Sequence, residues 1–215
     1  MKTISVFGAT GKTGVPFVKQ ALEKGYFVRA LVRKPGKVKF TNPNLLLIKG
    51  DVLDPTKVNE VISGSDAVVS LLGHVKDSPE DLQVKAIKNI IQAMEMAGVT
   101  RLISVTGGGV RDPQNDQPGF MDKLIVYIMK NLAGKGARAA LLDGRAHAEM
   151  IRQSGLDWTI VRGPMLTDDP AKGNYQVGYV GKLKGFKLTR ADLASFILVE
   201  IEKNSFIKKM PFIVN

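Results

Sequence analysis

The sequence predicts an α/β fold, namely a doubly wound, mostly parallel sheet with helices on both faces. Short, apolar, β-branched segments alternate with amphipathic segments of helical period along the first half of the chain. The short segments are apolar throughout, which is typical of strands buried on both faces of a parallel sheet. The first of them runs directly into three glycines, Gly8, Gly11 and Gly14, which open the first helix.

The first half of the chain supplies most of the expected sheet. Turn residues separate its elements: Gly25 ends the first helix, Gly73 the fourth strand and Gly98 the third helix. The short β–α–β spacings imply right-handed crossovers. The expected strands are residues 3–7, 27–33, 45–48, 66–72 and 101–106, and the expected helices are residues 16–24, 56–62 and 82–97.

The second half is less regular and adds further elements to the same domain. A polar loop is expected over residues 111–119, and no stretch has the composition of an interdomain linker. We therefore expect one domain over residues 1–215, with substrate-side elements mainly from residues 107–135 and 163–187. The expected helices are residues 120–132, 137–153 and 190–203, and the expected strands are residues 157–162, 175–180 (an edge strand) and 212–214.

The composition excludes several classes of protein. The chain has 215 residues, 44% of them hydrophobic, and this apolar fraction is too high for intrinsic disorder. Without cysteine there can be no disulfide framework, thiolate nucleophile or cysteine-ligated metal. The two histidines lack clustered ligand spacing, so no metal site is expected. Residues 3–7 are too short for a signal-peptide core and no apolar run reaches the roughly 18 residues of a membrane span, so we expect a cytoplasmic protein.

The charge of the chain is strongly positive at its N-terminal end. The formal net charge is +11, and residues 1–50 alone hold ten Lys or Arg against one Glu. Such a balance suggests an anionic ligand, and nucleic acid is one candidate. The positive residues are dispersed singly, without interleaved aromatics, which favours a phosphate-bearing small molecule; a plain solvated surface is the other alternative. We expect neither nucleic acid nor a membrane as partner, and a monomer or weak dimer.

The glycine triplet is the motif that carries chemistry. Gly8 permits the tight turn out of the strand, Gly11 lets a pyrophosphate approach the backbone, and Gly14 lets the helix pack close to the sheet. The helix N-terminus then offers N–H groups and partial positive charge to phosphate. A P-loop is excluded because Val6 stands where its first glycine is required. The turn residues Thr10, Lys12 and Thr13 are expected to bind the cofactor together with the three glycines.

The end of the second strand indicates which dinucleotide is bound. NAD sites usually place a carboxylate there to bind the ribose 2′-hydroxyl, but no Asp or Glu lies between Glu23 and Asp51. Arg33 instead offers a guanidinium suited to a 2′-phosphate, and Lys34 and Lys12 add charge. NADP(H) is therefore the expected cofactor. The alternative for Arg33 is an exposed charge at a strand end.

Two further pairs of neighbouring residues follow the ends of strands, at the edge of the sheet where ligands bind in open α/β folds. Asp51 and Val52 come after the third strand and are expected near the adenine. Leu72 and Gly73 come after the fourth strand and are expected near the ribose and nicotinamide.

These residues resemble the atypical short-chain dehydrogenase/reductases, and most closely their NmrA-like and biliverdin reductase B (flavin reductase) branch. The resemblance covers nearly the whole chain. It implies an NADP-binding Rossmann-like domain with substrate over the nicotinamide, and it implies that Thr106, Pro164 and Met165 border the nicotinamide. The similar segments are residues 8–14 (GATGKTG), 31–33 (LVR), 50–52 (GDV), 71–73 (LLG), 154–162 (SGLDWTIVR) followed by Pro164, and 188–194 (LTRADLA).

The sequence departs from that family in its acid–base pair. Typical members use Tyr-x-x-x-Lys, in which Tyr delivers the proton and Lys lowers the pKa of the Tyr. Here the two positions fall on Leu141 and Arg145, and Tyr127 is followed four residues later by Asn131. The pair is therefore absent.

Thr106 and His74 are the candidate catalytic residues. Thr106 takes the family's Ser/Thr position, with Ser104 as a second candidate. His74 follows the fourth strand, and both a contact with substrate and a plain structural role remain open for it. His147 lies in an expected helix and is assigned to surface or helix packing.

Two other groups have a structural and a functional interpretation. Asp168 and Asp169 precede Pro170 and are expected to form a polar turn rather than a catalytic pair. An apolar stripe in residues 120–132 could roof an aromatic substrate pocket, because methionine-rich surfaces adapt to ligands, but we expect it to pack in the core. The stripe consists of Phe120, Met121, Leu124, Ile125, Ile128 and Met129.

An acceptor that needs no matched acid can still be reduced without the Tyr–Lys pair. Flavins and quinones take hydride and are then protonated by water, so that positioning the nicotinamide is sufficient. The sequence therefore predicts an NADPH-dependent reductase of an aromatic or quinonoid acceptor (flavin, quinone or tetrapyrrole-like). The alternative is a redox-sensing regulatory protein of the NmrA-like kind, which binds NADP without turnover.

Overall fold

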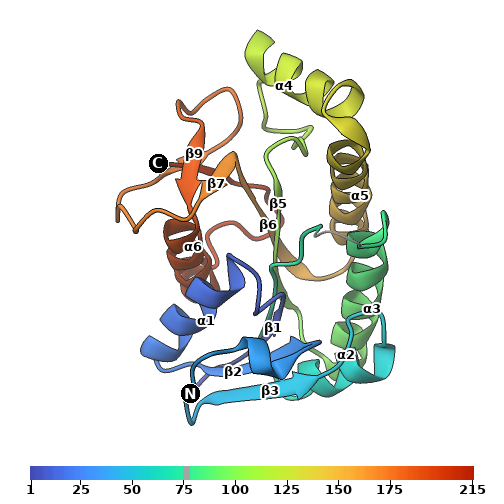
Figure 1. Cartoon of the computed structure of the whole chain (residues 1–215), viewed down its shortest axis with the longest axis vertical. Coiled ribbons are helices and arrows are strands. Elements are labelled where there is room, and N and C mark those ends of the chain that lie inside the picture. Colours follow the sequence, from blue (N-terminus) through green and yellow to red (C-terminus); the bar gives the residue numbers. More distant parts are fainter. Residues whose placement is uncertain (75–77) are drawn as a thin grey trace.

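The computed structural model describes residues 1–74 and 78–215 as one layered α/β unit (Figure 1). Its strands are β1 (Thr3–Phe7), β2 (Phe27–Val32), β3 (Leu45–Lys49), β4 (Ala67–Ser70), β5 (Arg101–Gly107), β6 (Asp157–Gly163), β7 (Met165–Thr167), β8 (Gln176–Gly178), β9 (Lys187–Thr189) and β10 (Phe212–Val214). Its helices are α1 (Gly14–Glu23), the 3-10 turn η1 (Pro35–Lys37), α2 (Pro55–Ile62), α3 (Leu82–Ala97), α4 (Phe120–Asn131), α5 (Gly134–Gln153) and α6 (Arg190–Lys203).

The main sheet has eight strands in the order β3-β2-β1-β4-β5-β6-β10-β8. Every pairing is parallel except that of β8 with β10, which places β8 antiparallel at one edge. The chain leaves β1 toward β2 on one side and returns to pair β4 on the other. The strand order therefore reverses between β1 and β4, which is where open α/β sheets form a ligand crevice at the carboxyl ends of their strands. The predicted doubly wound fold is confirmed.

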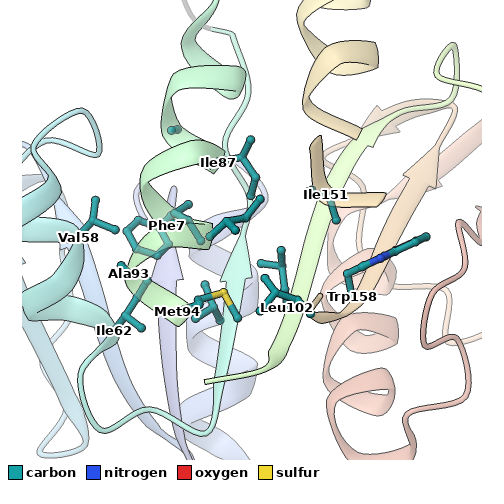
Figure 2. Close-up of a cluster of buried hydrophobic side chains, with 14 of the residues drawn as sticks. Phe7, Val58, Ile62, Ile87, Ala93, Met94, Leu102, Ile151 and Trp158 are labelled. Atoms are coloured by element: carbon teal, nitrogen blue, oxygen red, sulfur yellow. The ribbon is translucent and has the colours of Figure 1, made fainter. Parts of the chain in front are cut away.

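Two hydrophobic cores lie on the two faces of this sheet. Helices α1 and α6 cover one face, and α2, α3 and α5 cover the other (Figure 1). Figure 2 shows the second core, in which Phe7 of β1 and Leu102 of β5 lie close to Met94 of α3 and Ile151 of α5. Both faces of the central strands are buried, which explains why their sequences are mainly apolar.

The structure corrects three expectations in the second half of the chain. Residues 165–167 and 187–189 form a small parallel sheet, β7 with β9, that the sequence does not signal because each strand has only three residues. Helix α5 begins at Gly134 rather than at residue 137, and the edge strand is confined to residues 176–178.

The apolar stripe of residues 120–132 does not pack in the core. No residue of α4 is buried, and Phe120 is 79% exposed. The physical reason is the position of the helix: α4 contacts α5 and projects beyond the end of the sheet, so no sheet face is available to cover it (Figure 1). Met129 is the member of the stripe that reaches a cavity.

Candidate functional site

The glycine-rich turn has the geometry that a dinucleotide requires. Gly8 has φ +86°, and a Cβ there would lie 2.8 Å from the carbonyl oxygen of Leu71. The N–H of Gly11 donates to the carbonyl of Gly8 at 2.9 Å, which closes the turn. A Cβ at Gly14 would lie 2.1 Å from that same carbonyl oxygen, so α1 packs against the turn as closely as only glycine allows. This turn fits a pyrophosphate at the N-terminus of α1, whose first turn carries no acidic residue.

A cleft of about 390 Å³ opens beside this turn. It lies over the carboxyl ends of β1, β2, β3 and β4, and eleven of the predicted site residues line it. They are Gly8, Thr10, Gly11, Lys12, Thr13, Arg33, Asp51, Val52, Leu72, Gly73 and His74. Gly14 lies behind the turn, where it serves helix packing, and Lys34 is exposed and does not line the cleft among the described residues.

The charged residues that line the cleft are mostly cationic. Lys12, Arg33 and Arg190 contribute positive charge, and Asp51 is the acidic residue among the described lining. Asp51 is already engaged, since its Oδ1 accepts a hydrogen bond from the N–H of Leu53 at 2.9 Å. The cleft therefore carries a net positive charge suited to a phosphate-bearing ligand.

A second cavity of about 250 Å³ adjoins the cleft and shares Thr13, Leu71, Leu72, Gly73 and Leu166 with it. Thr106 and Pro164, which the family resemblance places beside the nicotinamide, line this cavity. Met165 does not line it among the described residues, because its side chain points outward from β7 with 58% exposure. The walls are mainly apolar, formed by Val105, Val110, Met129, Ala140, Leu141, Leu166 and Leu193.

Leu141 lies in the wall of this second cavity. The family resemblance assigns to Leu141 the tyrosine position of the Tyr–Lys pair. Close by, Gly144 brings α5 against Thr106, because a Cβ at Gly144 would lie 3.0 Å from the Thr106 hydroxyl oxygen. Tyr127 is on α4, 57% exposed, and is not part of the described lining. The described lining of the cavity thus combines the Thr106 side chain with mainly apolar walls.

His74 is held by a buried carboxylate. Its Nε2 lies 2.7 Å from Oδ2 of Asp143, whose side chain is 1% exposed. The same carboxylate accepts hydrogen bonds from the N–H groups of Gln83 and Val84 at 2.8 and 3.0 Å, so it also caps the first turn of α3. Asp143 thereby fixes His74 at the edge of the cleft.

The second histidine, His147, forms a buried hydrogen bond with Ser104. Nε2 of His147, on α5, lies 3.0 Å from the hydroxyl of Ser104, on β5, and both side chains are buried. Burial lowers the pKa of His147 to about 4, so the ring is neutral at physiological pH. Neither residue is part of the described lining of the two cavities. His147 is 3% exposed, so of the two roles expected for it, surface or helix packing, the surface role is wrong.

Several lining residues have no signal in the sequence. Gln83, Leu166 and Arg190 reach the cavities from α3, β7 and α6, far along the chain from the glycine-rich turn. The sequence predicts that Arg190 opens a helix just after its cap, Thr189. It does not predict the β7–β9 sheet that brings Arg190 to the cleft.

The site shows no sign of a metal centre in the part of the chain that is described. No group of three or more His, Asp or Glu side chains within residues 1–74 and 78–215 could hold a metal ion. Within those same ranges, no helix combines the length and apolar character needed to cross a membrane.

The strand order, the glycine-rich turn at the end of β1 and the cleft at the reversal point define a dinucleotide-binding protein of the Rossmann type. The chain belongs to the NAD(P)H-binding family, whose model matches residues 8–204.

The chain is similar to several curated proteins and solved structures. It is 31% identical to an uncharacterized chloroplastic protein of Arabidopsis thaliana over 95% of this chain and 74% of that protein. It is 29% identical to cinnamoyl-CoA reductase 1 of Petunia hybrida over 79% of this chain, and it spans about half of that reductase (55%). A solved structure from Streptococcus pneumoniae, named as a candidate NADH-flavin reductase, has a TM-score of 0.79 at 21% identity, with 100% of both chains covered, and shares the fold.

Proposed function

We propose that the protein is an NADPH-dependent reductase that transfers hydride to a flat aromatic or quinonoid acceptor, such as a flavin, a quinone or a tetrapyrrole-like molecule. The observation that carries this proposal is Leu141, an apolar side chain in the wall of the second cavity where a proton-donating tyrosine would be needed for carbonyl reduction. Family membership and the reductases among the similar proteins support hydride transfer as the reaction class.

The preference for NADPH rests on the end of β2. Arg33 lines the cleft directly after this strand, where an NAD-specific site would present a carboxylate. A guanidinium there can bind a 2′-phosphate through paired, charge-assisted hydrogen bonds. Lys12, which we expected to add charge at the same phosphate, is instead hydrogen-bonded to Asp168 at 3.1 Å.

The chain's own contribution to catalysis is positioning. A reduced nicotinamide supplies the hydride, and the apolar walls around Val105, Met129 and Leu141 would hold a planar acceptor against it while excluding water from one side. Thr106 offers a hydroxyl at the carboxyl end of β5 that can hydrogen-bond a carbonyl or ring nitrogen of the acceptor. His74, fixed by Asp143, is the second polar candidate, on the side of the nucleotide cleft.

Oxidation of NADPH in the presence of FMN, a benzoquinone or biliverdin tests the proposal. We expect turnover with at least one of them, measured as loss of NADPH absorbance against a control without protein. Tight NADPH binding with no turnover of any acceptor would contradict the reductase and favour a regulatory NADP-binding protein, because the missing Tyr–Lys pair supports that role nearly as well.

A further inference from the structure

The outer wall of the nucleotide cleft comes from the second half of the chain. Leu166 of β7 and Arg190, the first residue of α6, line the cleft together with the glycine-rich turn. β7 pairs with β9, and β9 leads directly into α6, so both residues lie on one continuous lobe. A ligand in the cleft would therefore contact this lobe as well as the turn.

The start of α6 is held by a buried network. The hydroxyl of Thr189 donates to the carboxylate of Asp192 at 2.7 Å and accepts from the N–H of Asp192 at 3.1 Å. Asp192, only 1% exposed, also accepts from the N–H groups of Lys172 and Gly173 at 2.9 and 3.0 Å. The backbone of Arg190 is thus fixed beside the cleft, and its side chain is 19% exposed.

A carboxylate joins Arg190 to the glycine-rich turn. Oδ1 of Asp168 accepts from the guanidinium of Arg190 at 2.7 Å, and its Oδ2 accepts from the ammonium of Lys12 at 3.1 Å. Lys12 and Arg190 line the cleft, whereas Asp168 is not part of its described lining. One carboxylate shared by two cations leaves one positive charge unbalanced at the cleft, which an anionic ligand can neutralise.

We propose that Arg190 binds the pyrophosphate of the dinucleotide, and that Asp168 is a positioning residue that holds Arg190 and Lys12 as a clasp across the cleft. The proposal rests on the proposed function, because it requires a dinucleotide in this cleft. It assigns different phosphates to the two arginines: Arg33, at the end of β2, binds the 2′-phosphate that only NADPH has, and Arg190 binds the pyrophosphate common to NADPH and NADH.

Two simpler interpretations of Asp168 make different predictions. As an ordinary exposed ion pair it would contribute little, since such pairs are screened by solvent. As a mere counter-ion it would compete with phosphate, so its removal would strengthen binding. As a positioning residue it keeps both cations over the cleft, so its removal would weaken binding and speed dissociation.

Affinity and dissociation rate of NADPH and NADH, measured on the full chain by calorimetry and stopped-flow fluorescence, separate these cases. Arg190→Ala should weaken both cofactors by the same factor, about tenfold or more, and Arg190→Lys should recover part of the loss. Arg33→Ala should weaken NADPH alone. Asp168→Asn should speed dissociation of both cofactors about threefold to tenfold. The control is Glu149→Gln, which removes the exposed Arg152–Glu149 pair of 2.9 Å on α5 and should change neither cofactor.

Each outcome bears on one claim. If Arg190→Ala leaves both affinities unchanged while Arg33→Ala is selective for NADPH, the clasp is overturned and the proposed cofactor site stands. If Asp168→Asn binds more tightly, Asp168 is a competitor and its positioning role is overturned. If the wild-type protein binds neither cofactor, the proposed function itself fails, and the clasp with it.

Discussion

Arg162 of β6 and Asp116 of the loop after β5 form a buried, bidentate ion pair, with N–O distances of 2.6 and 2.9 Å. Their side chains are 0% and 2% exposed. The guanidinium also donates to the carbonyl of Val110 at 3.0 Å, and Asp116 accepts from the N–H of Val180 at 3.0 Å. Val110 lines the second cavity. The pair therefore fastens the loop beside the acceptor cavity to the sheet.

Asp116→Ala should strongly destabilise the fold, because it leaves the Arg162 guanidinium buried without its counter-charge. Breaking a buried pair from one side typically costs about 3–5 kcal/mol. The free energy of unfolding, measured by urea titration, should therefore fall by about 3–5 kcal/mol. Glu149→Ala, which removes an exposed pair, should cost less than about 1 kcal/mol, and equal effects of the two substitutions would contradict the role of the buried pair.

NADPH should bind more tightly than NADH. A charge-assisted pair between Arg33 and a 2′-phosphate contributes roughly 1.5–3 kcal/mol, or about tenfold to a hundredfold in affinity. Calorimetric titration of both cofactors measures the difference, and Arg33→Ala should remove it. Equal affinities in the wild-type protein would show that Arg33 is only an exposed charge at a strand end.

Gly11→Val should abolish cofactor binding while the fold is retained. A Cβ at Gly11 would lie 3.2 Å from the carbonyl oxygen of Gly8, and the larger side chain would occupy space that a pyrophosphate needs. Circular dichroism should stay native while NADPH binding is lost. Gly155→Val is the matched control, because a Cβ there meets nothing within 4 Å. Wild-type NADPH affinity in a folded Gly11→Val protein would refute the glycine fingerprint.

Stability should fall on mild acidification because of His147. Burial lowers its pKa from 6.5 to about 4, so below about pH 6.5 the unfolded chain binds a proton that the folded chain does not. The free energy of unfolding should therefore decrease as the pH falls from about 6.5 toward 4, by up to about 3 kcal/mol. His147→Gln should flatten this slope in urea titrations at several pH values. An unchanged slope would mean that His147 does not titrate between those values.

The first half of the fold and most of the nucleotide cleft could be predicted because their signals are local. Each strand is a short, mainly apolar run bounded by turn residues, and the residues that follow the strands meet at one edge of a parallel sheet. Gly8, Arg33 and Asp51 line one cleft for that reason.

The rest depends on contacts between distant residues. Asp116 and Arg162 are 46 positions apart, and Lys12 and Asp168 are 156 apart, so no periodicity or spacing brings either pair together. The apolar face of α4 has the helical period of a core helix, yet the helix extends beyond the sheet and stays exposed. Amphipathic spacing indicates a helix but not what that helix packs against.

The most direct test of the proposed reductase compares a simple ketone with a quinone or FMN as acceptor at saturating NADPH. With Leu141 and Arg145 in place of a Tyr–Lys pair, no acid is matched to an alkoxide, and lost general-acid catalysis typically costs about 10²–10⁴-fold. We expect quinone or flavin turnover to exceed ketone turnover and to change little in His74→Gln or Tyr127→Phe. Ketone reduction as fast as, or faster than, quinone reduction would contradict the proposal, because it would require a proton donor at this site.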